Sequence, residues 1–425
     1  MKRGLWVAAA MAVAALAGGC KNSGHDQNST EMRVLNAVVD AEPLDVLVDD
    51  DVKVSALALG STSSYSEFNS GTRDVKVRSS TEQSVLTDKS VSFVDGQEAT
   101  LLVYGKRNSI LTLLLADDAT TASSGHVRVR LVNLSPDTGP VDLYAIPGEV
   151  GSAAATVAAT TYGSISTAAE VASGSLRIAV TASGTQDVLF QAPARSFTDN
   201  ATITVVVLPS LGGKLVNVAL LTQGVGGTGT LIANSLGRVK AVNAIPDSSG
   251  LTFKADGTTL LASVPFTGSS SYVTTAVGSR TLQLEQSNIP GVSIASLARQ
   301  VDPARDYSVL ALGNIAAPQI VALVDDNSFP LAGAAKLRFV NAYAGPGTVD
   351  VLVNFASQAS GLVFAGASSY YQLTPGTTYT ITFSTPGAVS VIATLTPAEL
   401  DAGAVYTAYL FGASGSGQVR LVRDR

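Results

Sequence analysis

Two pairs of adjacent aspartates are the residues whose type and position come closest to a metal site. Asp117-Asp118 and Asp325-Asp326 each follow an apolar run that closes a segment of the chain. Calcium is bound by about six to eight oxygen atoms, often from clustered carboxylates, so these side chains are calcium candidates at domain junctions. The loop spacing D-x-D-x-D-G is absent from the sequence, which favours solvated acidic turns instead. We therefore expect no metal and no other cofactor.

Three tyrosines near the C-terminus are candidates for binding a sugar ring. Tyr370, Tyr371 and Tyr379 could form a stacking platform in the last part of the chain. Adjacent residues of a strand face opposite ways, so one of Tyr370 and Tyr371 is expected in a core. The only tryptophan, Trp6, lies in an N-terminal segment that we expect to be removed. The sequence favours packing over ligand binding for these rings.

Catalytic patterns are scarce. With one cysteine and two histidines, the chain is not expected to build a disulfide framework, a zinc site or a Cys-His catalytic pair. His25 lies in a polar stretch, and His126 stands just before an expected strand. Gly224–Gly229 matches G-x-G-x-x-G, but no helical pattern follows to receive a phosphate, which favours a linker. We expect no catalytic residue and no enzymatic activity.

The N-terminal segment contains one candidate for covalent modification by a lipid, Cys20. A basic start is followed by an apolar stretch, Leu5–Ala17, that is too short for a bilayer span of about 20 residues. The sequence Leu16-Ala17-Gly18-Gly19-Cys20 then resembles a bacterial lipobox, with Ala17 where Leu, Val or Ile is usual. A plain signal peptide cleaved near Gly18 is the alternative. We expect a signal peptide over 1–19, a lipid such as palmitate on Cys20, and a flexible tether over 20–32.

The residue after the cysteine is informative about the localisation of the protein. By resemblance to Gram-negative lipoproteins, a residue other than aspartate at this place, here Lys21, favours the outer membrane. The lipid on Cys20 would then be the contact with the membrane.

The rest of the chain repeats itself four times. Each unit opens on a short segment that ends in asparagine, and the four are Arg33–Asn36, Arg130–Asn133, Lys240–Asn243 and Arg338–Asn341. An alternating apolar segment follows each opening. Next comes G-x-x-S-x-Y, or a form one residue shorter, ending in Tyr65, Tyr272 and Tyr370. The second unit keeps only a relic, Gly163–Ser166.

Short alternating segments separated by turn residues are typical of β-sandwiches. A unit of about 90 residues can bury its own core, unlike a solenoid repeat. We predict an all-β chain of four tandem immunoglobulin-like antiparallel β-sandwich domains, at 33–118, 126–222, 237–326 and 334–425. A glycine-rich linker over 223–236 is expected to act as a hinge between the first two and the last two domains.

These motifs resemble a catalogued bacterial family, domain of unknown function 4397. The resemblance rests on the R-x-V-N opening, the V-D-V-x-V segment, G-x-x-S-x-Y and the following turn glycine, and it covers nearly all of 33–425. Members occur in tandem on lipoproteins and cell-surface proteins, so the resemblance implies a sandwich fold and an extracytoplasmic address. It implies no catalytic or binding residues.

Composition limits the function further. The chain is 46% apolar and 14% charged, which opposes disorder, and its net charge of −6 opposes nucleic-acid binding. We expect a non-enzymatic, lipid-anchored envelope protein, a structural or adhesive stalk whose partner is an envelope protein or a glycan. The alternative is a polysaccharide- or protein-ligand binding module of the outer membrane or periplasm.

Overall fold

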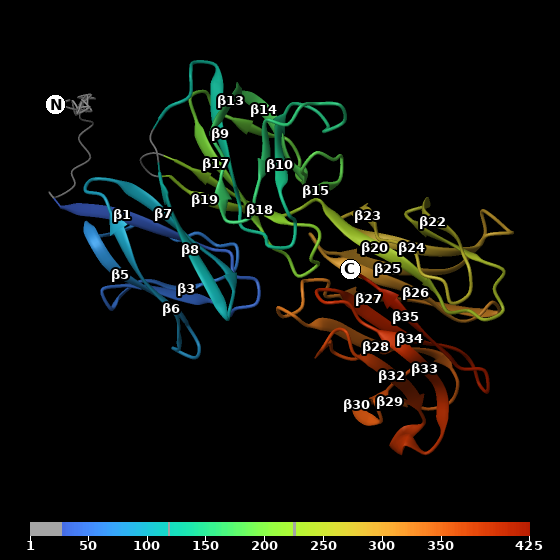
Figure 1. Cartoon of the computed structure of the whole chain (residues 1–425). Helices are drawn as coiled ribbons and strands as arrows, with labels where there is room; N and C mark the ends of the chain where they lie inside the picture. Colours follow the sequence, from blue (N-terminus) through green and yellow to red (C-terminus); the bar gives the residue numbers. More distant parts are fainter. Residues whose placement is uncertain (1–27, 118–119, 224–226) are drawn as a thin grey trace, which may run out of the picture.

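The structure is a computed structural model that describes residues 28–117, 120–223 and 227–425. Within these ranges every regular element is a β-strand except the short 3-10 helix η1 (Pro386–Ala388). The strands form eight sheets, two for each repeat (Figure 1). The predicted all-β fold of four sandwich-like domains is confirmed. Cys20 and Asp118 lie outside the described residues. The flexible tether predicted over 20–32 is wrong at its end, because the first strand begins at Ser29 and buries Ser29 and Thr30.

Repeat 1 shows the common plan. One sheet has the order β4-β1-β7-β8, with β1 and β7 parallel, and the other has the order β3-β2-β5-β6. Apolar side chains from both sheets, among them Val34, Val46, Val77 and Leu101, form the core between them. The strands are β1 (Ser29–Asn36), β2 (Leu44–Val48), β3 (Asp51–Leu57), β4 (Ser66–Asn69), β5 (Gly71–Ser79), β6 (Val85–Phe93), β7 (Glu98–Lys106) and β8 (Ser109–Ala116).

Repeat 2 is the most elaborate. Its larger sheet adds β19 beside β18, and its other sheet has the order β11-β10-β14-β15 with β16 also paired to β14. The strands are β9 (His126–Asn133), β10 (Val141–Ile146), β11 (Val157–Thr160), β12 (Ser164–Ile165), β13 (Ala169–Ala172), β14 (Gly174–Ala182), β15 (Val188–Gln191), β16 (Arg195–Phe197), β17 (Thr202–Leu208), β18 (Asn217–Thr222) and β19 (Gly229–Ile232).

Repeats 3 and 4 return to the plan of repeat 1, with two four-stranded sheets each. The strands of repeat 3 are β20 (Leu236–Asn243), β21 (Leu251–Ala255), β22 (Thr258–Val264), β23 (Val273–Ala276), β24 (Gly278–Gln286), β25 (Ser293–Val301), β26 (Asp306–Asn314) and β27 (Ala317–Asp325). Those of repeat 4 are β28 (Ala335–Ala344), β29 (Val349–Val353), β30 (Ala356–Leu362), β31 (Tyr371–Leu373), β32 (Thr378–Ser384), β33 (Val391–Glu399), β34 (Val405–Ala413) and β35 (Gln418–Arg423).

Two repeated polar residues hold each first strand in place. In repeat 1 the buried Asn36 donates to the Leu57 carbonyl of the other sheet at 2.9 Å and accepts from the Val38 amide at 2.9 Å. Ser63 of G-x-x-S-x-Y accepts from the Val34 amide of β1 at 2.9 Å. The other repeats make the same contacts through Asn133, Asn243, Asn341, Ser166, Ser270 and Ser368. The asparagine joins the sheets, and the serine binds the returning chain to the first strand.

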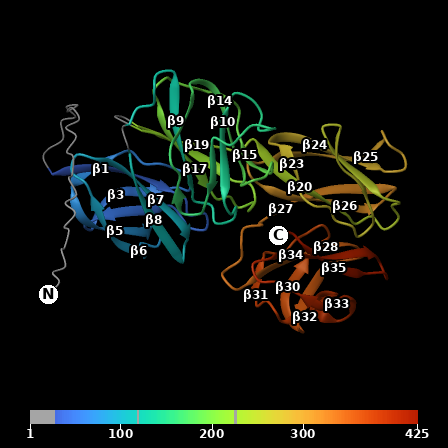
Figure 2. The same cartoon turned by 45° about the horizontal axis from the view of Figure 1, so that its top comes forward.

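The repeats pack in two pairs, 1 with 2 and 3 with 4 (Figures 1 and 2). We call the sheet that contains the first strand of each repeat (β1, β9, β20 or β28) the β1-type sheet. In each pair, the two β1-type sheets face each other, and each uses the face that points away from its own core. Between repeats 1 and 2 the apolar contact includes Leu35, Leu102, Val132 and Val206. The equivalent contact between repeats 3 and 4 is formed by Val242, Ala244, Leu310, Leu312, Val340, Ala342, Tyr409 and Phe411. The central strands of these sheets, such as β1 and β7, are therefore buried on both faces.

The predicted flexible linker over 223–236 is wrong for its second half. Residues 229–232 form β19, which pairs with β18. Asn234 is buried and donates to the carbonyls of Leu189 and Val216 at 2.8 and 2.9 Å. A Cβ on Gly229 would lie 2.2 Å from Thr62 Oγ1, so this glycine permits close packing against repeat 1. The glycine content that suggested a hinge serves a close contact at this position.

The two pairs also touch each other. Ser210, in the loop between β17 and β18, donates to the Ala304 carbonyl of repeat 3 at 3.1 Å. The C-terminal Arg425 donates to the carbonyls of Asn327 at 3.0 Å and Asp137 at 2.6 Å. Lys106 of repeat 1 reaches the Phe329 carbonyl at 3.0 Å. Loops of all four repeats thus meet near the middle of the molecule.

Candidate functional site

The most unusual chemistry of the described chain is a set of buried charges between paired repeats. Four equivalent positions of each repeat supply it, and they lie on or directly beside the strands of the sheet that contains β1 or its counterpart. A basic residue stands three places before the motif asparagine, opposite a hydroxyl on the parallel neighbouring strand. An acid or amide follows the next strand, and the tyrosine of G-x-x-S-x-Y completes the set. In chain order the sets are Arg33, Thr100, Asp117 and Tyr65; Arg130, Thr204, Gln223 and Ala168; Lys240, Ser308, Asp325 and Tyr272; Arg338, Thr407, Asp424 and Tyr370.

Between repeats 3 and 4 the ion pairs are exchanged. Arg338 of repeat 4 binds Asp325 of repeat 3, and Lys240 of repeat 3 binds Asp424 of repeat 4. The side chains of both carboxylates are 0% exposed, and those of both cations are 2% exposed. The cation of each repeat thus binds the carboxylate of the other repeat, as in the self-complementary interface of a twofold dimer.

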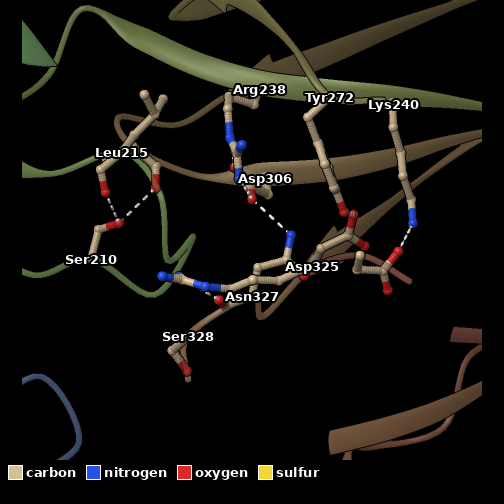
Figure 3. Close-up of polar contacts among 12 residues, drawn as sticks. Ser210, Leu215, Arg238, Lys240, Tyr272, Asp306, Asp325, Asn327 and Ser328 are labelled. Carbon is tan, nitrogen blue, oxygen red and sulfur yellow. Dashed lines mark hydrogen bonds and ion pairs between the residues drawn. The ribbon is translucent and has the colours of Figure 1, made fainter. Parts of the chain in front are cut away.

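Hydroxyl groups satisfy the remaining lone pairs of these carboxylates. Asp325 accepts from Tyr272, and it accepts from Ser308 at 2.7 Å. Asp424 accepts from Thr407. Figure 3 shows Tyr272 directed at Asp325 and Lys240 beside it. Because buried ions are costly unless paired and hydrogen-bonded, these donors are part of what makes the ion pairs tolerable.

A second buried cluster lies beside the first. Arg238 binds Asp306 with two nitrogen atoms, the Nε contact being 2.8 Å. Asn327 donates to the same carboxylate at 2.7 Å, and the Arg238 guanidinium lies 4.7 Å from the centre of the Tyr272 ring (Figure 3). Asn327 in turn accepts from Arg425 through its carbonyl. This cluster ties repeat 3 to the segment that leads into repeat 4.

The pair formed by repeats 1 and 2 has a weaker version of the first network. Arg33 lies 3.4 Å from Asp117 of its own repeat and donates to the Thr222 carbonyl of repeat 2 at 3.1 Å. Arg130 of repeat 2 donates to the Ala116 carbonyl of repeat 1 at 2.9 Å. Gln223, which stands where the other repeats have aspartate, donates to Asp117 at 3.3 Å. Backbone carbonyls and one amide thus replace the exchanged ion pairs.

Burial and paired charges shift the pKa values of these groups. Burial alone would lower the pKa of Lys240, but Asp424 and other nearby negative groups outweigh it, and the pKa is raised. Burial raises the pKa of Asp306 more than Arg238 and Asn327 lower it. Burial, together with Asp325, raises the pKa of Tyr272 well above its ordinary value. The tyrosine therefore remains a hydrogen-bond donor at neutral pH.

The candidate calcium ligands have other partners. Asp117 and Asp325 are buried, so the solvated-turn interpretation is wrong for both. They are buried because their sheet faces another repeat and an arginine from the interface lies beside them. Asp326 binds Lys336 at 3.0 Å and is partly exposed. No group of three or more acidic, histidine or cysteine side chains in the described ranges could hold a metal ion.

The three candidate tyrosines do not form one platform. Tyr370 lies 5.0 Å from the guanidinium of Arg338, toward repeat 3. Tyr371 packs on Phe339 of its own core, and Tyr379 is buried with its hydroxyl donating to the Thr374 carbonyl at 2.8 Å. Tyr370 and Tyr371 face opposite ways as expected, but the neighbouring repeat covers the outward one.

Sequence reasoning did not assign the basic residues to this site. A cation at the same place in all four R-x-V-N motifs was visible, and so was the tyrosine of G-x-x-S-x-Y. On an alternating strand such a cation resembles an ordinary solvent-facing residue. His126, the remaining catalytic candidate in the described chain, only approaches the Ser124 carbonyl with Nδ1 at 3.0 Å. Gly224–Gly226 of the G-x-G-x-x-G pattern lie outside the described residues.

Across the described residues, no helix has the length and apolar character needed to cross a membrane.

Comparison with known proteins identifies a family. A family model described as a domain of unknown function (DUF4397) matches residues 30–144 and 237–351, which together exceed half of the chain. The predicted tandem recurrence of this domain is confirmed. No curated protein matches the chain. Among solved structures, one titled "The Bacillus anthracis TIE protein" is similar at 9% identity, over 91% of this chain and 69% of the other, with a TM-score of 0.16. A TM-score this low supports no argument about fold or function.

Proposed function

The chain belongs to the DUF4397 family, and from this premise we propose that it is a non-enzymatic, lipid-anchored protein of the cell envelope. Its task is to hold an interaction surface for an envelope partner away from the membrane. The lipid on Cys20 attaches the protein, and Lys21 directs it to the outer membrane. The four repeats then serve as the presenting body.

The observation that carries this proposal is the interlocking of the repeats. Buried apolar faces and exchanged ion pairs fix repeat 3 to repeat 4, and a related contact fixes repeat 1 to repeat 2. Such contacts limit rotation between neighbouring domains, whereas small polar contacts between domains leave them free to move. A body of fixed shape suits presentation of a surface. The charged groups of this site are used in holding the repeats together, which supports a structural role over a catalytic one.

Membrane fractionation tests the anchor and the address. We expect Cys20→Ser to leave the outer-membrane pellet and appear in the soluble envelope fraction. Lys21→Ser is the matched control, because it changes the neighbouring residue and keeps the thiol. Sedimentation of the Cys20→Ser protein with the outer membrane would refute the lipid anchor.

A binding module for a polysaccharide or a protein is the second candidate, and one hollow of repeat 2 favours it. A surface cavity of about 330 Å³ lies between β11 and β12, and its lining is rich in hydroxyl groups, including Thr160, Thr161 and Ser164. Hydroxyl groups and backbone amides at such edges can bind glycan hydroxyls or an extended peptide. Binding of purified envelope polysaccharide that is lost in Thr161→Val/Ser164→Ala would favour this function. Capture of a protein partner unaffected by the same change would favour the presenting role.

A further inference from the structure

Repeat 2 lacks one member of the set that the other repeats share. Two residues after the motif serine, the other repeats have Tyr65, Tyr272 and Tyr370, and repeat 2 has Ala168. The alignment is fixed by hydrogen bonds, because Ser166 accepts from the Leu131 amide of β9 at 2.9 Å as its counterparts do in their repeats. The alanine therefore stands where a tyrosine ring would be.

The other repeats show what the ring does at this place. Tyr65 lies 4.9 Å from the Arg33 guanidinium, and Tyr370 lies 5.0 Å from that of Arg338. The hydroxyl of Tyr65 donates to Asp117 at 2.6 Å, and that of Tyr272 donates to Asp325. In repeats 1 and 3 the phenol is therefore held by its face against a cation and by its hydroxyl on an acceptor. Tyr370 of repeat 4 keeps the contact with the cation, but its hydroxyl has no hydrogen-bond partner among the described residues.

Repeat 2 keeps the residues that surround the tyrosine ring in the other repeats, and a cavity takes the place of the ring. A cavity of about 100 Å³ is lined by Arg130, Ser166, Ala168, Thr202 and Gln223, among others. Most of the lining side chains are only half-buried, so the cavity reaches the surface. A buried apolar cavity of about 150 Å³ is known to bind benzene, so a space of this order suits one ring whose substituent points outward.

The cavity also has an acceptor in the right place. Gln223 occupies the position of the aspartates that accept the tyrosine hydroxyls in repeats 1 and 3. Its Nε2 donates to Thr204 at 3.0 Å and to Asp117, while its Oε1 is buried with no hydrogen-bond partner among the described residues. An orphaned buried acceptor is uncommon in folded proteins and indicates a place where a donor is missing.

We propose that this cavity of repeat 2 binds a phenolic ring, with its face on Arg130 and its hydroxyl donating to Gln223. The ring belongs either to a tyrosine side chain of a partner or to a free small phenol. Because the cavity lies next to the contact between repeats 1 and 2, the bound ring also stabilises that pair. The site does not depend on the lipid anchor or on the address of the protein.

The test uses p-cresol, which is the tyrosine side chain without its backbone, on the whole mature chain. We expect p-cresol to raise the melting temperature of the wild type in a saturable way. Toluene, which has the ring and no hydroxyl, raises it less at equal concentration. Ala168→Tyr fills the cavity from within, so it melts higher than the wild type and no longer responds to p-cresol. Ala168→Phe is the matched control, since it fills the space without the hydroxyl.

The acceptor is tested separately, so that the result does not depend on Ala168→Tyr folding well. Gln223→Met keeps the length of the side chain, and we expect it to abolish the preference for p-cresol over toluene. The proposal is overturned if p-cresol gives no saturable shift, or if it shifts Ala168→Tyr as much as the wild type. N-acetyl-tyrosinamide separates the two sources: binding of both probes indicates a partner's tyrosine, and binding of p-cresol alone indicates a free phenol.

Discussion

Removal of Arg338 is the most direct test of the interlocked repeats. The side chain is 2% exposed and binds Asp325, the Thr407 hydroxyl at 3.0 Å and the Val324 carbonyl at 3.1 Å. Arg338→Ala leaves the Asp325 carboxylate buried without its cation. Breaking a buried pair from one side costs about 3–5 kcal/mol. Because Asp325 keeps the donors Tyr272 and Ser308, we expect a loss near the lower end, about 3 kcal/mol.

The assay is thermal unfolding of the whole chain followed by circular dichroism or calorimetry. For a cooperative unit of about 150–250 residues, each 1 kcal/mol lowers the melting temperature by about 2–4 °C, so the loss corresponds to about 6–12 °C. Four domains need not unfold in one step, so the shift is measured on the transition that contains repeats 3 and 4. A protease added during heating degrades the repeats that have unfolded. The temperature at which the fragment containing repeats 3 and 4 disappears identifies their transition.

A surface arginine of the same repeat is the matched control. Arg423 binds Asp401 at 2.8 Å, but the two side chains are 56% and 68% exposed. Exposed pairs contribute about 0–1 kcal/mol, so Arg423→Ala should move the melting temperature little. Equal shifts for the two variants would refute the claim that the buried pair locks the repeats. In Arg338→Ala/Asp325→Ala no unpaired charge remains, and its loss should be smaller than the sum of the single losses.

Three further outcomes follow from the described contacts. Calcium should leave the melting temperature unchanged, because Asp117 and Asp325 are already bound to arginine and hydroxyl groups; a large rise would restore the metal hypothesis. A protease of broad specificity should spare 229–236, because β19 is paired and Asn234 is buried, and early cleavage there would contradict this pairing. Burial raises the pKa of Asp142, but the Ala159 and Gly184 amides outweigh it and the pKa is lowered, so its stabilisation exists above about pH 4 and is lost as the pH falls through the lowered value. Urea midpoints between about pH 2 and 5 should therefore depend less on pH in Asp142→Asn than in the wild type, and equal slopes would contradict the assignment.

The fold was predictable because its signals are local. Alternating apolar residues, turn glycines and the asparagine of each R-x-V-N motif act within one repeat, and Asn36 shows how: it closes a turn two residues on and reaches the other sheet. The extent of each sandwich follows from such short-range patterns. Strand β19 was missed because its residues, Gly229–Ile232, carry little side-chain pattern, and its pairing uses the backbone of β18.

The site could not be predicted in the same way, because it exists only between repeats. Lys240 and Asp424 are far apart in the sequence and meet because two sheets face each other. Nothing in the alternation of β20 distinguishes a cation that faces water from one that faces another sheet. The recurrence of the cation in all four repeats was the available signal, and it becomes informative once each sheet is known to be covered on both sides.

The difference between the two pairs has a consequence for assembly. A self-complementary face could in principle join any two repeats, because the motif cation recurs in all four. Repeats 3 and 4 exchange cations and acids, so either one placed against repeat 2 would meet Gln223 where it requires an aspartate and would leave a cation buried without its partner. An unpaired buried charge costs several kcal/mol, which is enough to reject the wrong partner. Repeat 1 keeps its own acid beside Arg33 and needs only carbonyl and amide contacts from its neighbour, which Thr222 and Gln223 supply. The loss of one acid in repeat 2 therefore puts an amide at the 1–2 contact where the 3–4 contact has a carboxylate, and it disfavours pairing of repeat 3 or 4 with repeat 2.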